Sequence, residues 1–344
     1  MEAIVELIEG GLNGLTVYLS AHVLTCLIPA FFIAGAITTF ISQAAVLKYL
    51  GPSAKKWLSY TIASVSGSVL AVCSCTVLPL FGAIYKRGAG LGPAVAFLYA
   101  APAINILAII YSARLLGYDL GIARAVGAVV FSIAIGLVMA WLYRKEEAGK
   151  KQQQFVPPAD SPASKSIGQQ AIFLGVLVGI LVFAAAEIWV AAILSLIVLS
   201  LILWRWFSRG EVKHWFKETL RFVKLITPWL LAGVFIAGIL RVIVPESLVT
   251  DYVGSNSLSA NFIASFLGAL MYFATLTEVP IIKAFMDLGM DSGPALALLL
   301  AGPALSIPNM LVIRNIMGVK KTLVYISLVV LFATITGYIF GLID

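Results

Sequence analysis

Hydrophobic positions along this chain fall in long runs, and polar positions gather in the gaps between them. A helix needs about 20 apolar residues to cross the hydrocarbon core of a membrane. Runs of that length are predicted as spans at 13–43, 93–113, 120–143, 168–186, 188–207, 225–244, 293–313 and 321–342. Two further apolar stretches, 57–85 and 257–286, are less regular. The pattern predicts an all-α polytopic membrane protein with about 8–10 membrane segments.

Composition agrees with this prediction, because 61% of the 344 residues are hydrophobic and only 11% are charged. A soluble domain carries about a quarter charged residues. The net charge of +7 comes from Lys and Arg at the ends of the spans, as at the cytoplasmic side of a membrane protein. No basic stripe lies on a polar face, so nucleic acid is not an expected partner. Glu2, Glu6 and Glu9 precede the first apolar run, which is unlike a signal peptide.

The chain repeats itself at an offset of 201 residues, and the matched positions are mainly glycines and prolines. Among apolar helices, chance similarity rarely aligns so many residues of these two types, so an internal duplication is predicted. The clearest matches are Pro79 with Pro280, Gly88 with Gly289, Gly92 with Gly293, and Pro102 with Pro303.

Equivalent loops of the two copies differ in the sign of their charge, which predicts that the copies are inverted relative to each other. The basic loops contain Lys48, Lys55, Lys56, Lys86 and Arg87, and the matching loops contain Glu246, Asp251, Asp287 and Asp291. The predicted organisation is an N-terminal membrane repeat (1–143), a cytoplasmic polar linker (144–166), two connecting transmembrane helices (167–210) and a C-terminal membrane repeat (211–344).

The stretches 57–85 and 257–286 are predicted to be re-entrant hairpins or broken helices. If 57–85 crossed fully, Lys86 and Arg87 would lie outside together with the basic linker, whereas a return to the starting side places both basic groups inside. Inverted repeats with broken helices near the midplane recur among transporters. The alternative is that both stretches cross the membrane and one central span does not.

A cysteine pair lies in the middle of the first irregular stretch, in the segment Cys73-Ser74-Cys75-Thr76 that precedes Pro79. Proline disfavours helical backbone just before it, and in extended backbone both thiols point to one side. Two sulfurs on one side suit a soft, thiophilic ligand. The competing interpretation is close packing of small residues between helices.

The equivalent stretch carries a carboxylate in place of cysteines, in the segment Thr275-Leu276-Thr277-Glu278-Val279-Pro280. Ionisable groups within a membrane are expensive and face a cavity or a partner, so Glu278 is a candidate proton carrier. The competing interpretation is a structural acid that binds a broken helix end or pairs with Lys283. A second matched pair of motifs places Asn105 after Pro102, and Ser306 and Asn309 around Pro308.

Other chemistry finds little support in the sequence. No phosphate-binding loop is present, so ATP hydrolysis is not expected, and neither His22 nor His214 has a second metal-type ligand nearby. We expect no enzyme, no cofactor and no metal site, apart from soft-ligand contacts by Cys73 and Cys75.

These motifs resemble the predicted permease family that includes the organoarsenical efflux permeases, of the ArsP or YraQ-like type. The resemblance spans roughly 20–143 and 220–342. It implies a multi-pass permease of the cytoplasmic membrane that exports trivalent organoarsenicals, which are thiophilic and suit a cysteine pair. The residues that carry it are Cys73-Ser74-Cys75, Pro79, Lys86-Arg87-Gly88-Ala89, Gly92, Pro102, Glu278-Val279-Pro280, Gly289, Gly293 and Ala301-Gly302-Pro303-Ala304 with Ser306 and Pro308.

The resulting hypothesis is a secondary transporter in the lipid bilayer that moves a small-molecule substrate and couples this movement to protons through Glu278. A homo-oligomer is compatible with this hypothesis. Two alternatives remain, a membrane thiol–disulfide redox protein that uses the cysteine pair and a passive channel. The candidate substrate-binding residues are Cys73, Ser74, Cys75, Thr76, Pro79, Asn105, Thr275, Thr277, Glu278, Pro280, Ser306 and Asn309.

Overall fold

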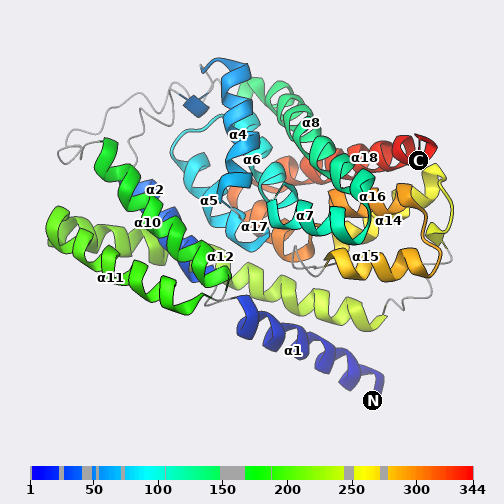
Figure 1. The fold of residues 1–344 in the computed structure, drawn as a ribbon, viewed down its shortest axis with the longest axis horizontal. Coiled ribbons are helices and arrows are strands. Elements are labelled where there is room, and N and C mark those ends of the chain that lie inside the picture. Colours follow the sequence, from blue (N-terminus) through cyan, green and yellow to red (C-terminus); the bar gives the residue numbers. More distant parts are fainter. Residues whose placement is uncertain are drawn as a thin grey trace.

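The computed structural model describes residues 2–22, 27–40, 49–51, 54–70, 74–104, 106–147, 167–186, 188–243, 252–271 and 278–343. Within these ranges the secondary structure is helical, without a strand, which confirms the predicted all-α class (Figure 1). The helices are α1 (Glu2–His22), α2 (Ile28–Phe40), α4 (Lys56–Leu70), α5 (Ser74–Lys86), α6 (Leu91–Ala103), α7 (Ile106–Leu115), α8 (Tyr118–Leu142), α10 (Ile167–Ala185), α11 (Trp189–Trp206), α12 (Arg209–Ile243), α14 (Leu258–Leu270), α15 (Glu278–Asp287), α16 (Ser292–Ala301), α17 (Ile307–Met317) and α18 (Val319–Ile343).

Four of the described helices, α8, α11, α12 and α18, are long and apolar enough to cross a membrane. A fifth span is possible by length if α6 and α7, which are bent by 46° relative to each other, count as one. Large apolar side chains point outward on these helices, including Trp204 at 85% exposure and Val190 at 72%. An outer surface of this kind suits contact with lipid, so the architecture is that of a polytopic membrane protein.

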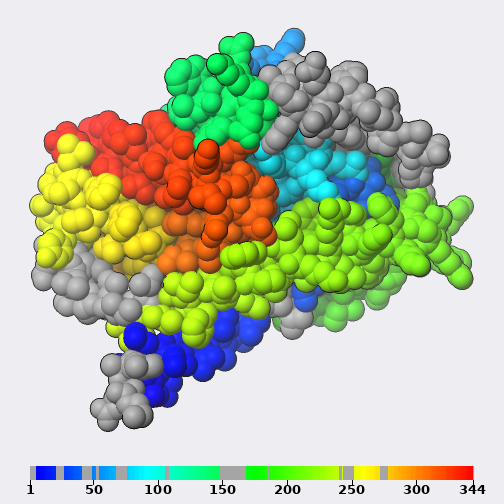
Figure 2. Space-filling view, turned by 180° about the vertical axis from the view of Figure 1, so that it is seen from behind, coloured from blue at the N-terminus to red at the C-terminus, as the bar shows by residue number. Residues whose placement is uncertain are grey.

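Four predicted spans differ from the helices that the structure describes. The span predicted at 13–43 falls on two helices, α1 and α2, which both pack along α12 (Figure 2). The spans predicted at 93–113 and 293–313 are each divided into two helices, near Pro102 and Pro303, because proline interferes with the helical hydrogen-bond ladder. The span predicted at 225–244 begins earlier, since α12 starts at Arg209 with a charged first third.

The two halves contain the same five helices in the same order. The series from α4 to α8 is followed 201 residues later by the series from α14 to α18, so that α8 begins at Tyr118 and α18 at Val319. The positive-φ glycines of the described chain also match at this offset, with Gly88 and Gly289 before the third helix and Gly117 and Gly318 before the fifth. In each copy the third helix packs against the first and the fifth. The duplication seen in the sequence is therefore present in the helix boundaries and in the packing.

The stretches predicted to be hairpins return to the end at which they start. The backbone N–H of Gly90 donates to the carbonyl oxygen of Leu50 at 2.8 Å, which brings together the residues that flank α4 and α5. In the second copy the N–H of Asp291 donates to the carbonyl of Val253 at 3.2 Å. The two arms of each hairpin pack against the helix that follows, α6 or α16. The two ends of each stretch therefore lie close together, as the ends of a hairpin do, and the re-entrant path through a membrane stays a prediction.

The fifth helices of the two copies lie side by side and run in opposite directions (Figure 1). Near one end, Lys321 at the start of α18 forms an ion pair at 3.1 Å with Glu146, just after α8. Further along, the rings of Phe131 and Phe332 are 5.2 Å apart. As the residue number rises along α8 it falls along α18, so the two helices are antiparallel.

Basic segments that the sequence predicts on one side of the membrane meet at one end of the bundle. Lys86 at the end of α5 binds Glu218 of α12 with an N–O distance of 2.7 Å. The Tyr85 hydroxyl donates to Glu147 at 3.5 Å. Most of the predicted linker, residues 148–166, lies outside the described residues. The assignment of this end to the cytoplasm stays a prediction.

Candidate functional site

A buried ion pair joins the two halves of the molecule. Nη2 of Arg124, in α8, lies 3.3 Å from Oε2 of Glu278, the first residue of α15. The two side chains are 0% and 1% exposed. Taking two charges out of water costs several kcal/mol per ion, and ionisable groups at such positions in a membrane protein usually serve a function. This pair is therefore the starting point for the site.

Arg124 connects four helices through its other hydrogen bonds. Its Nε donates to the carbonyl oxygen of Ala103 at 3.3 Å, and its Nη1 donates to the Ser112 hydroxyl at 3.0 Å. Ala103 is the last residue of α6, where carbonyl groups lack helical partners and carry partial negative charge. The guanidinium group is thus held by α6, α7 and α15 while it projects from α8.

Glu278 uses only one carboxylate oxygen in this arrangement. Within the described residues, Oε1 is buried and has no hydrogen-bond partner. The backbone of Gly302 closes this side of the carboxylate, since a Cβ at that position would lie 2.5 Å from Oε1. The N-terminus of α15 favours a negative charge through the helix dipole. Oε1 is therefore a buried acceptor without a hydrogen-bond partner in the described part of the bundle.

Two buried tyrosines extend the site toward α18. The Tyr325 hydroxyl donates to the carbonyl oxygen of Ala304 at 3.4 Å. Tyr99, in α6, lies near both Arg124 and Tyr325, and its buried hydroxyl has no hydrogen-bond partner among the described residues. We call this set the buried polar cluster, and its members are Tyr99, Ser112, Arg124, Glu278 and Tyr325.

Glu278 pairs with Arg124, a partner that the sequence did not predict. The alternative that paired Glu278 with Lys283 is wrong. Lys283 instead forms an exposed ion pair with Asp287, one turn further along α15, at 2.6 Å. Pro280, the other predicted residue of α15, is exposed. The substrate-binding role of both residues stays a prediction.

The cysteine motif adopts a different backbone from the extended one considered from the sequence. Helix α5 begins at Ser74 and continues through Cys75, Thr76 and Pro79, so this part is not unwound. Thr76 and Pro79 are buried, and their neighbours Leu78 and Phe81 are fully buried. Burial of this apolar face in the bundle outweighs the local preference that Pro79 sets. Cys73 lies outside the described residues, as do Asn105, Thr275 and Thr277.

Ser306 and Asn309 have separable roles. The Ser306 hydroxyl accepts a hydrogen bond from the Asn309 backbone N–H at 3.4 Å, which caps the start of α17. Helix capping accounts for this serine without a ligand. The side-chain oxygen of Asn309 is buried and has no partner in the described part of the chain. Asn309 therefore stays a candidate for binding.

Sequence reasoning missed Arg124, the central residue of the buried polar cluster. The sequence did contain a signal for Arg124, because an arginine inside the predicted span 120–143 costs free energy to bury in a membrane, as a glutamate in a hairpin does. Tyr99 and Tyr325 gave no such signal, since tyrosine is common in apolar helices. Among the described residues, no group of three or more His, Cys, Asp or Glu side chains is arranged to hold a metal ion.

Spanning helices, paired hairpins and a charge pair buried between two halves define a polytopic α-helical membrane protein. Within that class, a family model described as a predicted permease (ArsP_1) matches residues 10–342. The chain therefore belongs to this predicted permease family, as its motifs suggested. Membership of this family supports a transport function and a multi-pass location in a membrane.

Curated relatives carry family names rather than activities. The UPF0718 protein MJ0584 of Methanocaldococcus jannaschii is 48% identical to this chain, over 100% of this chain and 98% of that protein. The UPF0718 protein YraQ of Escherichia coli is 24% identical, over 88% of this chain and 72% of that protein. No solved structure matches the chain.

Proposed function

We propose that this protein is a secondary-active permease of the cell membrane that exports a small thiophilic solute, such as a trivalent organoarsenical. Family membership supports transport, and the buried polar cluster supports a site inside the bundle. The observation that carries the proposal is Glu278, a buried carboxylate that pairs with Arg124 through Oε2 and whose Oε1 has no hydrogen-bond partner among the described residues.

The substrate site in this proposal lies where the two hairpins approach the α8–α18 pair. Glu278 begins the second arm of the second hairpin and contacts Arg124 of α8. At the offset of 201, Val77 of the first hairpin corresponds to Glu278, and Tyr325 of α18 corresponds to Arg124. The halves also exchange equivalent contacts, because α15 packs on α7 and α5 packs on α17. By this correspondence we expect the start of α5, with Thr76, to take the place beside Tyr325 that Glu278 takes beside Arg124.

The residue roles follow from this placement. Cys73 and Cys75 contact the thiophilic solute, and Ser74, Thr76, Asn105, Thr275 and Thr277 supply polar contacts. Glu278 takes up a proton at Oε1, which removes its negative charge and weakens its pair with Arg124. The second hairpin is then held less firmly against α8. Loss of the proton restores the pair, so that protonation is coupled to the position of the hairpin.

Inversion of the two copies is part of the proposal, because it provides equivalent routes to the site from both sides of the membrane. The antiparallel packing of α8 on α18 supports it. Phe131 and Phe332 are equivalent at the offset of 201 and contact each other, as residues near a two-fold axis do.

Uptake into everted membrane vesicles tests the proposal. Vesicles that contain the protein are compared for trivalent methylarsenical and inorganic arsenite, with and without a proton gradient. We expect gradient-dependent accumulation of the organic species. Accumulation that ignores the gradient and shows no counterflow would indicate a passive channel instead.

Two variants and a matched control assign the roles. Glu278→Gln should abolish the response to the gradient, and Cys73→Ser/Cys75→Ser should reduce accumulation of the arsenical. Asp287→Asn, an exposed carboxylate on the same helix as Glu278, should leave both unchanged. Undiminished transport by both test variants would overturn the role assignment, and no transport of either arsenic species would discard the arsenical substrate.

A further inference from the structure

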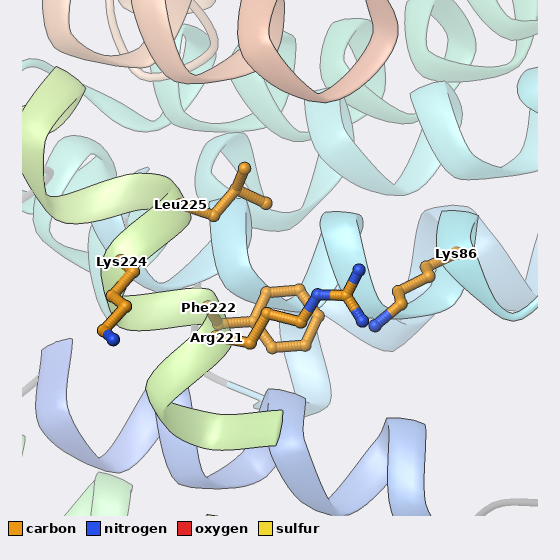
Figure 3. Close-up of a pocket in the computed structure, with 5 residues that line it drawn as sticks. All are labelled: Lys86, Arg221, Phe222, Lys224 and Leu225. Atoms are coloured by element: carbon orange, nitrogen blue, oxygen red, sulfur yellow. The ribbon is translucent and has the colours of Figure 1, made fainter. Parts of the chain in front are cut away.

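A basic hollow lies at the end of the bundle where α5 ends against the middle of α12. It is open to the surface, has a volume of about 390 Å³, and is lined by Lys86, Arg221, Phe222, Lys224 and Leu225. Figure 3 shows the Arg221 side chain extending toward Lys86 in front of the Phe222 ring. Three of the five lining residues are cations, whereas the buried polar cluster lies elsewhere, between α8 and α15.

The cations at the hollow outnumber their partners. Glu218 is shared, with its Oε2 2.7 Å from Nζ of Lys86 and its Oε1 3.7 Å from Nη1 of Arg221. Arg87 also interacts with this carboxylate, and Lys224 lines the hollow as a further positive charge. Among the described residues, the lining of the hollow holds three cations and Glu218 is the carboxylate that pairs with two of them, so the hollow keeps an excess of positive charge and favours an anion.

The hollow also marks the border between the charged and the apolar parts of α12. After Lys224 the helix carries no charged residue until Arg241. Apolar side chains project outward on both sides of the border, with Leu220 55% exposed and Trp229 39% exposed. Basic side chains beside a lipid-facing apolar surface occupy the level of lipid head groups in a membrane.

We propose that this hollow binds the phosphate-bearing head group of an anionic membrane lipid. The phosphate interacts with Arg221 and Lys224, and with Lys86 over the Phe222 ring, where its Nζ lies 5.6 Å from the ring centroid. The acyl chains follow the apolar surface of α12 past Leu225 and Trp229. A bound lipid would bridge α5 and α12, and so would hold the first hairpin at this end of the bundle.

Native mass spectrometry of the full-length protein in detergent tests this site with three probes, phosphatidylglycerol, phosphatidylcholine and inorganic phosphate. We expect retention of phosphatidylglycerol in preference to phosphatidylcholine. Each cation near a membrane surface contributes about 1 kcal/mol, so Arg221→Gln/Lys224→Gln should weaken retention of phosphatidylglycerol by about tenfold or more. Both side chains are exposed, so the variant should fold.

The matched control is Lys213→Gln/Lys217→Gln, which removes two exposed cations of α12 that do not line the hollow. This control should retain phosphatidylglycerol like the unaltered protein. Equal losses in the two double variants would show diffuse attraction and overturn the site. Equal retention of phosphatidylcholine would overturn the preference for an anionic head group. Full displacement of the lipid by inorganic phosphate at millimolar concentration would overturn the lipid assignment in favour of free phosphate.

Discussion

Arg124 and Tyr325 stand at equivalent positions, 201 residues apart, and each donates a hydrogen bond to the carbonyl oxygen of an equivalent residue, Ala103 or Ala304. The duplicated bundle thus keeps the same contact with two different side chains. The partner of Arg124 differs in the same way, because Glu278 corresponds to Val77 in the other copy. The ion pair therefore takes its cation, Arg124, from the first copy and its anion, Glu278, from the second. The equivalent residues, Tyr325 and Val77, are uncharged.

Removing one member of the buried pair should destabilise the protein more than removing both. Arg124→Leu leaves the Glu278 charge uncompensated, and we expect a loss of about 3–5 kcal/mol in stability. Arg124→Leu/Glu278→Leu should recover most of that loss, because two apolar side chains replace the pair, but should not recover transport. Thermal unfolding in detergent micelles measures the first effect, and vesicle uptake measures the second. If Arg124→Leu/Glu278→Leu is no more stable than Arg124→Leu, this account is contradicted.

A methyl group at Gly302 should act directly on Glu278. Its Cβ would lie 2.5 Å from Oε1, so Gly302→Ala forces the carboxylate or the turn after α16 to move, at about 1–3 kcal/mol. We expect reduced gradient-dependent uptake with the bundle still folded. Gly175→Ala is the control, because nothing lies within 4 Å of a Cβ at that position in α10. Normal uptake by Gly302→Ala would show that Oε1 needs no fixed position.

The turn glycines should show equivalent sensitivity in the two copies. Gly88 has φ 96° and Gly289 has φ 107°, a region that residues with a Cβ rarely adopt. We expect Gly88→Ala and Gly289→Ala each to lower stability by about 1–3 kcal/mol. Gly210→Ala, in α12 at an ordinary helical position, should have no such effect. A clear difference between the first two variants would mean that the equivalent turns carry unequal strain.

Thiol trapping separates a ligand pair from a redox pair at Cys73 and Cys75. If these cysteines bind a thiophilic solute, they stay reduced, and trivalent methylarsenical slows their reaction with a membrane-permeant maleimide. Cys26, which is outside the motif, serves as the internal control and should react equally with and without the arsenical. A disulfide between Cys73 and Cys75 that forms and breaks with the redox state would favour the thiol–disulfide function instead.

The sequence predicted the helical class and the duplication, because both depend on local signals such as hydrophobic runs and matched glycines and prolines. It did not predict that Arg124 contacts Glu278, since this contact joins residues 154 positions apart. It placed the start of the α12 span late, because the charged first third of this helix does not resemble a membrane segment. The helical path of α5 through Pro79 follows from burial in the bundle, which no local pattern contains.

The antiparallel contact of α8 with α18 bears on the energy of the transport cycle. If the two halves of an inverted pair had identical sequences, the inward-open and outward-open conformations would have equal free energy, and the empty protein would rest equally in both. In the inverted arrangement that we propose, the differences between Tyr325 and Arg124 and between Val77 and Glu278 would remove that equality. Such a transporter would have a preferred resting side, set by a few substitutions between the copies rather than by the fold.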